Sequence, residues 1–384
     1  MKKLLLALCI FTFLTSFAQN SQSFFYGRTT GQLPFLEYGI GDDRLGGAKM
    51  TFLDSNILLK VVDSFKTKYK VQLSKYRAAY IDKKNLVSPL PGTINHLTGS
   101  WKVYGDSVYD YVTISLNEKL PYSSIQQIDP SRLVVEIFGA ESNTNWITQL
   151  NTIKEIKNAY YEQTEEDVMK VIIDLKHTQH WGHRIYYEGN RLVIRIKRQP
   201  EKPELKYLTI AVDAGHGGDN HGADGVTSKV LEKDYTLLIA KELRTALVKK
   251  KANVIMTREK DTTLSMPERI EFLKQVCPDM LISIHLNSSD VDSIQGVSTY
   301  YRYIGFRPLS VSILHQILNL NLKEYGNVGS FNFSLSGPTD YPNCLVEVAF
   351  LSNKGDEKRI LDPAFHKAVA KKIVEGIEEF LKNL

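Results

Sequence analysis

The residues best suited to metal chemistry lie in four short stretches of the C-terminal half. They are DAGHGG at 213–218, EKD at 232–234, SIHLN at 283–287 and LVEVAFLSN at 345–353. Two histidines and one glutamate are a known catalytic zinc set, which leaves the fourth coordination position to water. A further glutamate outside that set is what a zinc hydrolase needs to move protons. Together, in this order, the stretches predict a hydrolase with one zinc ion.

A wider set of motifs carries a resemblance to a known family. Residues 205–384 contain DAGHGG, GADG, LEKDYTLLIAKEL, VIMTR, ERI, LISIHLN, GVSTYY and LVEVAFLSN in that order. This part of the chain resembles the zinc-dependent N-acetylmuramoyl-L-alanine amidases of bacteria. The resemblance implies one Zn2+ per chain, held by His216, Glu232 and His285, with Glu347 as the catalytic residue. It also implies that the substrate is peptidoglycan.

Three functions are weighed for this site. The resemblance implies hydrolysis of the amide between N-acetylmuramic acid and L-alanine, for cell-wall remodelling or cell separation. A zinc peptidase that cuts within the stem peptide could use the same residues. The third alternative is a catalytically dead wall-binding scaffold, against which the intact ligand set and Glu347 argue. Mass analysis of the products from purified peptidoglycan separates the three.

The elements expected in residues 205–384 alternate between strand and helix. Strands are expected at 207–212, 254–257, 280–285, 297–301 and 344–350, and helices at 232–250, 267–276, 311–322 and from Pro363 onward. This alternation predicts an α/β fold with a mostly parallel sheet and helices on both faces. His216, His285 and Glu347 lie at or near the ends of strands, at the edge where ligands gather in such sheets. Glu232 begins a helix, whose dipole favours a carboxylate.

Two smaller β-rich domains are expected before this α/β domain. Residues 24–95 contain strand candidates at 57–62, 68–73 and 78–81, and YKVQLSKYRAAYIDKKNLV resembles the end of a bacterial Src-homology-3-like barrel. The segment SPLPG at 88–92 is expected to be a linker. Residues 100–198, with candidates at 111–116, 133–138, 168–175 and 192–196, resemble the AMIN-type domains that help place such amidases on the wall. A second linker is expected at 199–204.

We expect residues 24–198 to bind wall material and the linker around Pro200 and Pro203 to be cleavable. A fragment of residues 205–384 should then keep activity on soluble fragments and lose binding to sacculi. Some relatives carry an extra helix that blocks the zinc, inserted between the second histidine motif and the catalytic glutamate. Here only 61 residues separate His285 from Glu347. Residues 326–343 are rich in Gly, Ser and Asn, so we expect a loop that places no side chain on the metal.

The N-terminal residues and the charge balance predict the location of the protein and exclude one class of partner. Residues 1–18 combine Lys2 and Lys3, an apolar run at 4–14 and SFA at 16–18, which is typical of a secretory signal. The run is too short for a comfortable membrane span, and no other segment could cross a bilayer. We therefore expect an exported protein, periplasmic or wall-associated. Residues 205–384 carry 22 basic and 22 acidic residues, so no nucleic-acid partner is expected. The sequence does not specify an activator or division protein.

Several polar residues near the motifs have less specific roles. Asn287 is expected to bind substrate or, equally, to cap its turn. Arg258 is expected to be structural and to pair with Glu259 or Asp261. His221 is expected to lie beside the ligands or to face solvent.

Two further sets of residues could bind metal or form a disulfide. His177, His180 and His183 are spaced by three residues, but no acid or cysteine completes a set within their segment. We therefore expect a surface loop there. Cys277 and Cys344 each precede a strand candidate, and two buried thiols are favoured over a bridge.

Overall fold

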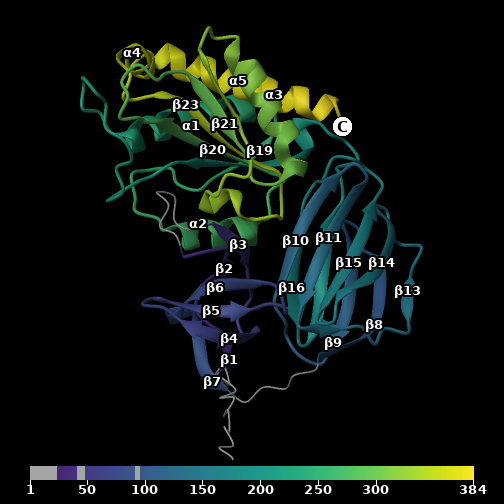
Figure 1. Ribbon diagram of the computed structural model, residues 1–384. Coiled ribbons are helices and arrows are strands. Elements are labelled where there is room, and N and C mark those ends of the chain that lie inside the picture. Colours follow the sequence, from purple (N-terminus) through teal and green to yellow (C-terminus); the bar gives the residue numbers. More distant parts are fainter. Residues whose placement is uncertain (1–23, 41–47, 91–95) are drawn as a thin grey trace, which may run out of the picture.

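The protein combines an α/β domain with two β-rich domains. The computed structural model describes residues 24–40, 48–90 and 96–384, with the side chains of all of these except 88–90. The predicted signal sequence lies outside these residues. In Figure 1 the α/β domain stands above, and the two β-rich domains lie beneath and beside it. Among the described residues, no helix is both long and apolar enough to span a bilayer.

The first β-rich domain is a single antiparallel sheet. Its strands pair in the order β3-β2-β6-β5-β4-β1-β7. They are β1 (Phe25–Thr29), β2 (Phe35–Glu37), β3 (Lys49–Phe52), β4 (Leu58–Ser64), β5 (Lys68–Gln72), β6 (Ala78–Asp82) and β7 (Leu86–Leu90). The three strands expected from the sequence correspond to β4, β5 and β6. The expected linker at 88–92 is wrong at its start, because residues 88–90 pair with β1 as part of β7. Residues 91–92 lie outside the described residues.

The second β-rich domain contains two sheets. One has the order β10-β11-β15-β14, and the other has the order β12-β8-β9-β17-β16 with β13 beside β8. The strands are β8 (His96–Gly105), β9 (Tyr109–Leu116), β10 (Tyr122–Ile128), β11 (Ser131–Phe138), β12 (Ala140–Glu141), β13 (Ile147–Gln149), β14 (Ile156–Glu165), β15 (Val168–Leu175), β16 (His183–Glu188) and β17 (Arg191–Lys197). One apolar core runs through both β-rich domains, from Leu36 to Ile196.

The α/β domain has the predicted mostly parallel sheet. Its order is β19-β18-β20-β23-β21-β22, and β21 is antiparallel to β23. The strands are β18 (Thr209–Ala214), β19 (Asn253–Met256), β20 (Met280–Asn287), β21 (Val297–Tyr300), β22 (Glu324–Val328) and β23 (Asn343–Phe350). The helices are α1 (Glu232–Lys249), α2 (Met266–Val276), α3 (Arg307–Leu318), α4 (Lys354–Ile360) and α5 (Pro363–Lys382). The predicted fold class is confirmed.

Helices cover both faces of this sheet. Buried residues of α1, α3 and α5 share the large apolar cluster on one face. Buried residues of α2 belong to a smaller cluster on the other face. Ser265 caps α2 through the backbone N–H of Glu268, and Asp362 caps α5 ahead of Pro363, as its sequence predicts.

The structure also differs from the sequence-based expectations at three elements. Helix α3 begins at Arg307 rather than 311 and ends at Leu318, because Pro308 fits the first turn and Asn319 ends the helix. Residues 326–328, within the expected loop, are instead the last part of strand β22, whose sequence EYGNV is extended through pairing with β21. The short helix α4 was not expected, although Asn353 caps it with two hydrogen bonds to its side chain.

The three domains are connected by packing between their side chains as well as by the linker. Trp181 of the second domain stacks on Phe380 of α5, with ring centroids 5.9 Å apart. Leu33 and Phe52 of the first domain pack against the apolar cluster beneath α2. A fragment of residues 205–384 would expose these contacts. We therefore expect it to be less stable than the whole chain, which revises the simple picture of a detachable catalytic domain.

Substitution of Trp181 by alanine tests this coupling. Trp181 is 2% exposed, so Trp181→Ala should cost about 3–5 kcal/mol of unfolding free energy. The measurement is urea unfolding of the whole chain. Trp146→Ala is the matched control, because Trp146 is 67% exposed and should change stability little. Equal stability of the two variants would contradict the shared core.

Candidate metal centre

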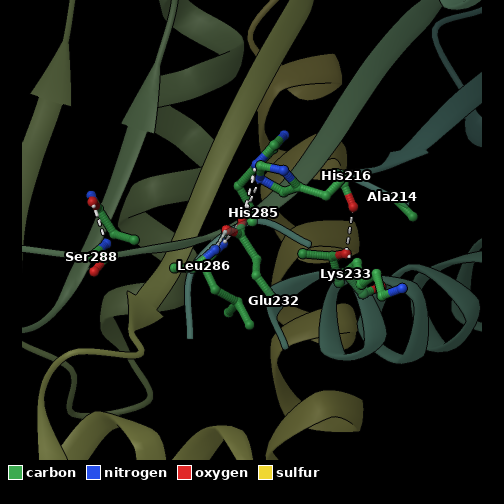
Figure 2. A network of polar contacts seen from close by, with 12 residues as sticks. Ala214, His216, Glu232, Lys233, His285, Leu286 and Ser288 are labelled. Atoms are coloured by element: carbon green, nitrogen blue, oxygen red, sulfur yellow. Dashed lines mark hydrogen bonds and ion pairs between the residues drawn. The ribbon is translucent and has the colours of Figure 1, made fainter. Parts of the chain in front are cut away.

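Two histidines and a glutamate converge at the carboxyl ends of two neighbouring strands and the start of a helix. His216 follows β18, His285 lies in β20, and Glu232 is the first residue of α1. One ligand atom from each lies within 4.8 Å of the others. Glu232 Oε1 is 3.1 Å from both His216 Nε2 and His285 Nδ1. Figure 2 shows both imidazoles turned toward this carboxylate.

Close backbone approach makes this convergence possible. A Cβ on Gly215 would lie 2.4 Å from the His285 ring, and one on Gly222 would lie 2.4 Å from Glu232 Oε2. His216 itself has a φ of 60°, in the left-handed region that costs a residue with a side chain about 1–3 kcal/mol. Only glycine therefore fits beside the side chains of His285 and Glu232.

Hydrogen bonds fix the orientation of the donor groups. His216 Nδ1 lies 2.8 Å from Asn220 Oδ1, which turns Nε2 toward Glu232. The Glu232 carboxylate accepts the backbone N–H groups of Leu286 and Ala223, at 3.0 and 2.8 Å. Asn220 was not predicted, although its position four residues after His216 in a glycine-rich turn is a usable signal.

A buried ion pair holds the histidine loop in place. Arg269 of α2 donates to Asp213 Oδ1 at 2.6 Å, and both side chains are 1% exposed. The same guanidinium donates to the carbonyl oxygens of Ala214 and His216. The motifs DAGHGG and ERI therefore contact each other. The sequence did not predict this contact, because Asp213 and Arg269 lie 56 positions apart.

Glu347 lies next to the three converging residues. It is on β23, where it pairs in register with His285 of β20. Its side chain is buried, and Oε2 has no hydrogen-bond partner among the described residues. A buried carboxyl oxygen without a partner is costly unless a bound ligand offsets the cost.

Burial and neighbouring charge set the protonation of these groups. Burial raises the pKa of Glu347 well above its usual value, and the charge of Glu232 adds to the rise. Burial opposes ionisation of Glu232, but the two histidine contacts outweigh it and lower the pKa of that carboxyl. The pKa values of these two nearby carboxyls are thus shifted in opposite directions, a pattern typical of catalytic pairs.

Comparison with known proteins names the domain. Residues 210–379 match the family described as N-acetylmuramoyl-L-alanine amidase, and residues 101–199 match the AMIN domain. The chain carries an N-acetylmuramoyl-L-alanine amidase domain. The predicted AMIN-like region is confirmed as an AMIN domain, and the Src-homology-3-like region stays a prediction.

Relatives and solved structures resemble the amidase domain. "Probable cell wall amidase LytH" of Staphylococcus epidermidis is 37% identical over 185 residues, 47% of this chain and 60% of that protein. The chain therefore spans less than two thirds of that relative. An N-acetylmuramoyl-L-alanine amidase of Clostridium difficile is 31% identical, with a TM-score of 0.44 over 46% of this chain and 97% of the other. The catalytic domain of CwlV from Bacillus (Paenibacillus) polymyxa is 30% identical, with a TM-score of 0.43 over 46% and 98%.

Other predicted residues of the amidase domain have structural surroundings. Asn287 Oδ1 accepts the N–H of Ser288 at 2.8 Å, which favours the turn-capping alternative. His221 is exposed. Arg258 is structural, but its predicted pairing is wrong. Buried beside the histidine loop, it donates to carbonyl oxygens such as that of Gly215 and to the hydroxyl of Thr236. The predicted partners Glu259 and Asp261 pair with Arg244 and Lys233 instead.

The histidine triad and the cysteines lie away from the centre. The predicted surface loop is wrong for His180 and His183, which are each 3% exposed, whereas His177 contacts Glu155. Burial lowers the pKa of His183 to about 3. Cys277 and Cys344 are both free, with Cys344 buried and Cys277 half-buried. Residues 326–343 were predicted to place no side chain on the metal. Among the described residues, the group that could hold a metal ion consists of His216, Glu232 and His285 and includes none of residues 326–343.

Replacement of Arg269 tests the support of the histidine loop. Arg269→Ala leaves Asp213 buried without its partner, which should cost about 3–5 kcal/mol of unfolding free energy. The measurement is denaturant unfolding. The matched control is Arg244→Ala, because the Arg244–Glu259 pair is exposed and should contribute at most about 1 kcal/mol. Similar losses in both variants would argue against a special role for Arg269.

Proposed function

We propose that this protein hydrolyses the amide bond between N-acetylmuramic acid and L-alanine in peptidoglycan, for cell-wall remodelling or cell separation. The observation that carries the proposal is the convergence of His216, Glu232 and His285 beside the unpartnered Glu347, inside a domain of the amidase family. Because peptidoglycan lies outside the cytoplasmic membrane, the proposal requires an exported protein, periplasmic or wall-associated.

We propose His216, Glu232 and His285 as the ligands of one Zn2+. The donor set of two imidazoles and one carboxylate fits zinc and leaves one coordination position for water. The contact of His216 with Asn220 is the kind of outer hydrogen bond that orients zinc-binding histidines. The free oxygen of Glu347 beside this set provides a partner for the water. When bound, zinc polarises the substrate carbonyl and lowers the pKa of water.

The residues of the chain supply the proton transfers. Glu347 Oε2 accepts a proton from the attacking water and returns it to the leaving amine nitrogen. Gly215 and Gly222 keep Cβ atoms away from the ligands, so the imidazoles and the carboxylate stay at their short separations.

The AMIN domain suggests how the enzyme reaches its substrate. We propose that residues 24–198 hold the protein on wall material, and the AMIN match over residues 101–199 supports this proposal. The test is cosedimentation of the inactive Glu347→Gln chain with purified sacculi. A fragment of residues 24–198, whose two domains share one core, should compete for the same sites. An inactive chain that stays in solution would contradict wall binding.

Separate loss of metal and of turnover tests the roles of the residues. Glu347→Ala should keep one zinc per chain and lose turnover by about 10²–10⁴-fold, as removal of a general base does. His216→Ala and His285→Ala should lose both zinc and activity, because each removes a ligand. Zinc content, melting temperature and hydrolysis rate are measured for all three variants. A folded Glu347→Ala protein with near-normal turnover would rule out the proton-transfer role.

Metal analysis and product analysis test the reaction itself. The purified chain should contain one zinc, and strong chelators should abolish activity because three ligands alone hold the ion. Mass analysis of digested peptidoglycan should find free stem peptides that begin with L-alanine. Fragments cut within the stem peptide would favour a peptidase, and the absence of any product would favour a scaffold.

A further inference from the structure

Three aromatic side chains form a wall beside the proposed zinc ligands. The wall consists of Tyr300 on β21 and of Phe331 and Phe333 in the loop after β22. The ring of Phe333 lies roughly parallel to that of His285, with centroids 6.1 Å apart. Phe331 packs on Phe333 at 4.4 Å and on Tyr300 at 4.7 Å. Phe331 and Phe333 are partly exposed, so the wall offers aromatic surface next to the metal centre.

An arginine joins this wall to the first β-rich domain. Arg302 Nη1 donates to Asn332 Oδ1 at 3.1 Å, and Asn332 lies between the two phenylalanines. Arg302 Nη2 donates to the carbonyl oxygens of Lys49 and Met50 on β3. One guanidinium therefore bridges the loop and a strand that precedes it by more than 250 residues. The planar fork of arginine suits such a bridge, since it can donate in several directions at once.

A second contact between the same two segments supports the bridge. A Cβ on Gly337 would lie 2.6 Å from the ring of Phe52, so Phe52 packs directly on the loop. Tyr303, which follows Arg302, donates its hydroxyl to the carbonyl oxygen of Gly337 at 2.8 Å. Strand β3 thus contacts the loop directly through Phe52 at one end and is joined to it by Arg302 at the other.

We propose that the first β-rich domain sets the position of this aromatic wall through Arg302, and that the wall holds the apolar face of a sugar ring of the glycan. Arg302 is a positioning residue, because it reaches the metal centre only through Asn332 and Phe333. Flat, partly exposed rings suit the C–H face of a pyranose, and the nearby metal ligands provide the polar groups that fix orientation. This inference rests on the proposed function.

The chemistry of the bridge predicts how substitutions rank. Hydrogen bonds from a charged group stabilise a structure more than neutral ones do. Arg302→Ala should therefore lower kcat/KM on peptidoglycan about ten-fold, mainly by raising KM. Zinc content should stay at the wild-type level, because no ligand changes. Arg302→Lys keeps the charge but cannot span all three acceptors, so it should fall between Arg302→Ala and the wild type. The matched control is Arg244→Ala, which removes an exposed ion pair to Glu259 in the amidase domain and should leave the kinetics unchanged.

A double-mutant cycle separates positioning from plain stability. Phe333→Leu keeps an apolar side chain but removes the ring beside His285, and should also raise KM. If Arg302 acts through Phe333, adding Arg302→Ala to Phe333→Leu should lower kcat/KM little further. Additive effects of the two substitutions, or wild-type kinetics of Arg302→Ala, would overturn the proposal.

Hydrogen exchange provides a readout that does not depend on turnover. The backbone N–H of Phe331 bonds to Tyr301, and those of Ser336 and Gly337 bond within the loop. Arg302→Ala should speed exchange in residues 329–337, whereas Arg244→Ala should not. Unchanged exchange would overturn the positioning role even if the enzyme is active. If the wild-type chain releases no product, the proposed function fails, while faster exchange in Arg302→Ala would still uphold the link between the domains.

Discussion

The buried carboxylate of Glu232 makes the contacts on which the candidate metal centre depends. It stands at the N-terminus of α1, where the helix dipole favours negative charge. Its oxygens accept the N–H groups of Ala223 and Leu286 and lie 3.1 Å from both imidazoles. A helix, a loop and a strand are thereby joined at one point. The same charge helps to raise the pKa of Glu347, the residue for which we propose proton transfer.

The strained backbone of the histidine loop is stabilised by buried cations. Arg269 pairs with Asp213 and bonds the carbonyl oxygens of Ala214 and His216, while Arg258 bonds that of Gly215. Burying two guanidinium groups is expensive unless most of their donors find acceptors. The consecutive carbonyls of the loop accept from both arginines, and Arg269 Nε alone of the donors of that side chain has no partner among the described residues. The left-handed conformation of His216 is thus maintained by groups outside the set of His216, Glu232 and His285.

The three domains behave as parts of one packed structure around this centre. Trp181 of the second domain lies in the core of the amidase domain. Phe52 of the first domain packs on the loop that contains Phe333. The linker at 199–204 is therefore only one of several connections. Shared burial of this kind makes the domains depend on one another for stability, since separating them would expose apolar surface to water.

The sequence alone determined the α/β alternation, the strand ends that carry His216 and His285, and the family of the domain, because periodicity, caps and short motifs are local signals. Tertiary structure decided the rest. It buried His180, formed β22 from a sequence with weak strand propensity, and brought Arg269 to Asp213. Such pairings join segments far apart in the chain, and their free energy comes from burial and contacts that exist only once the elements have packed together.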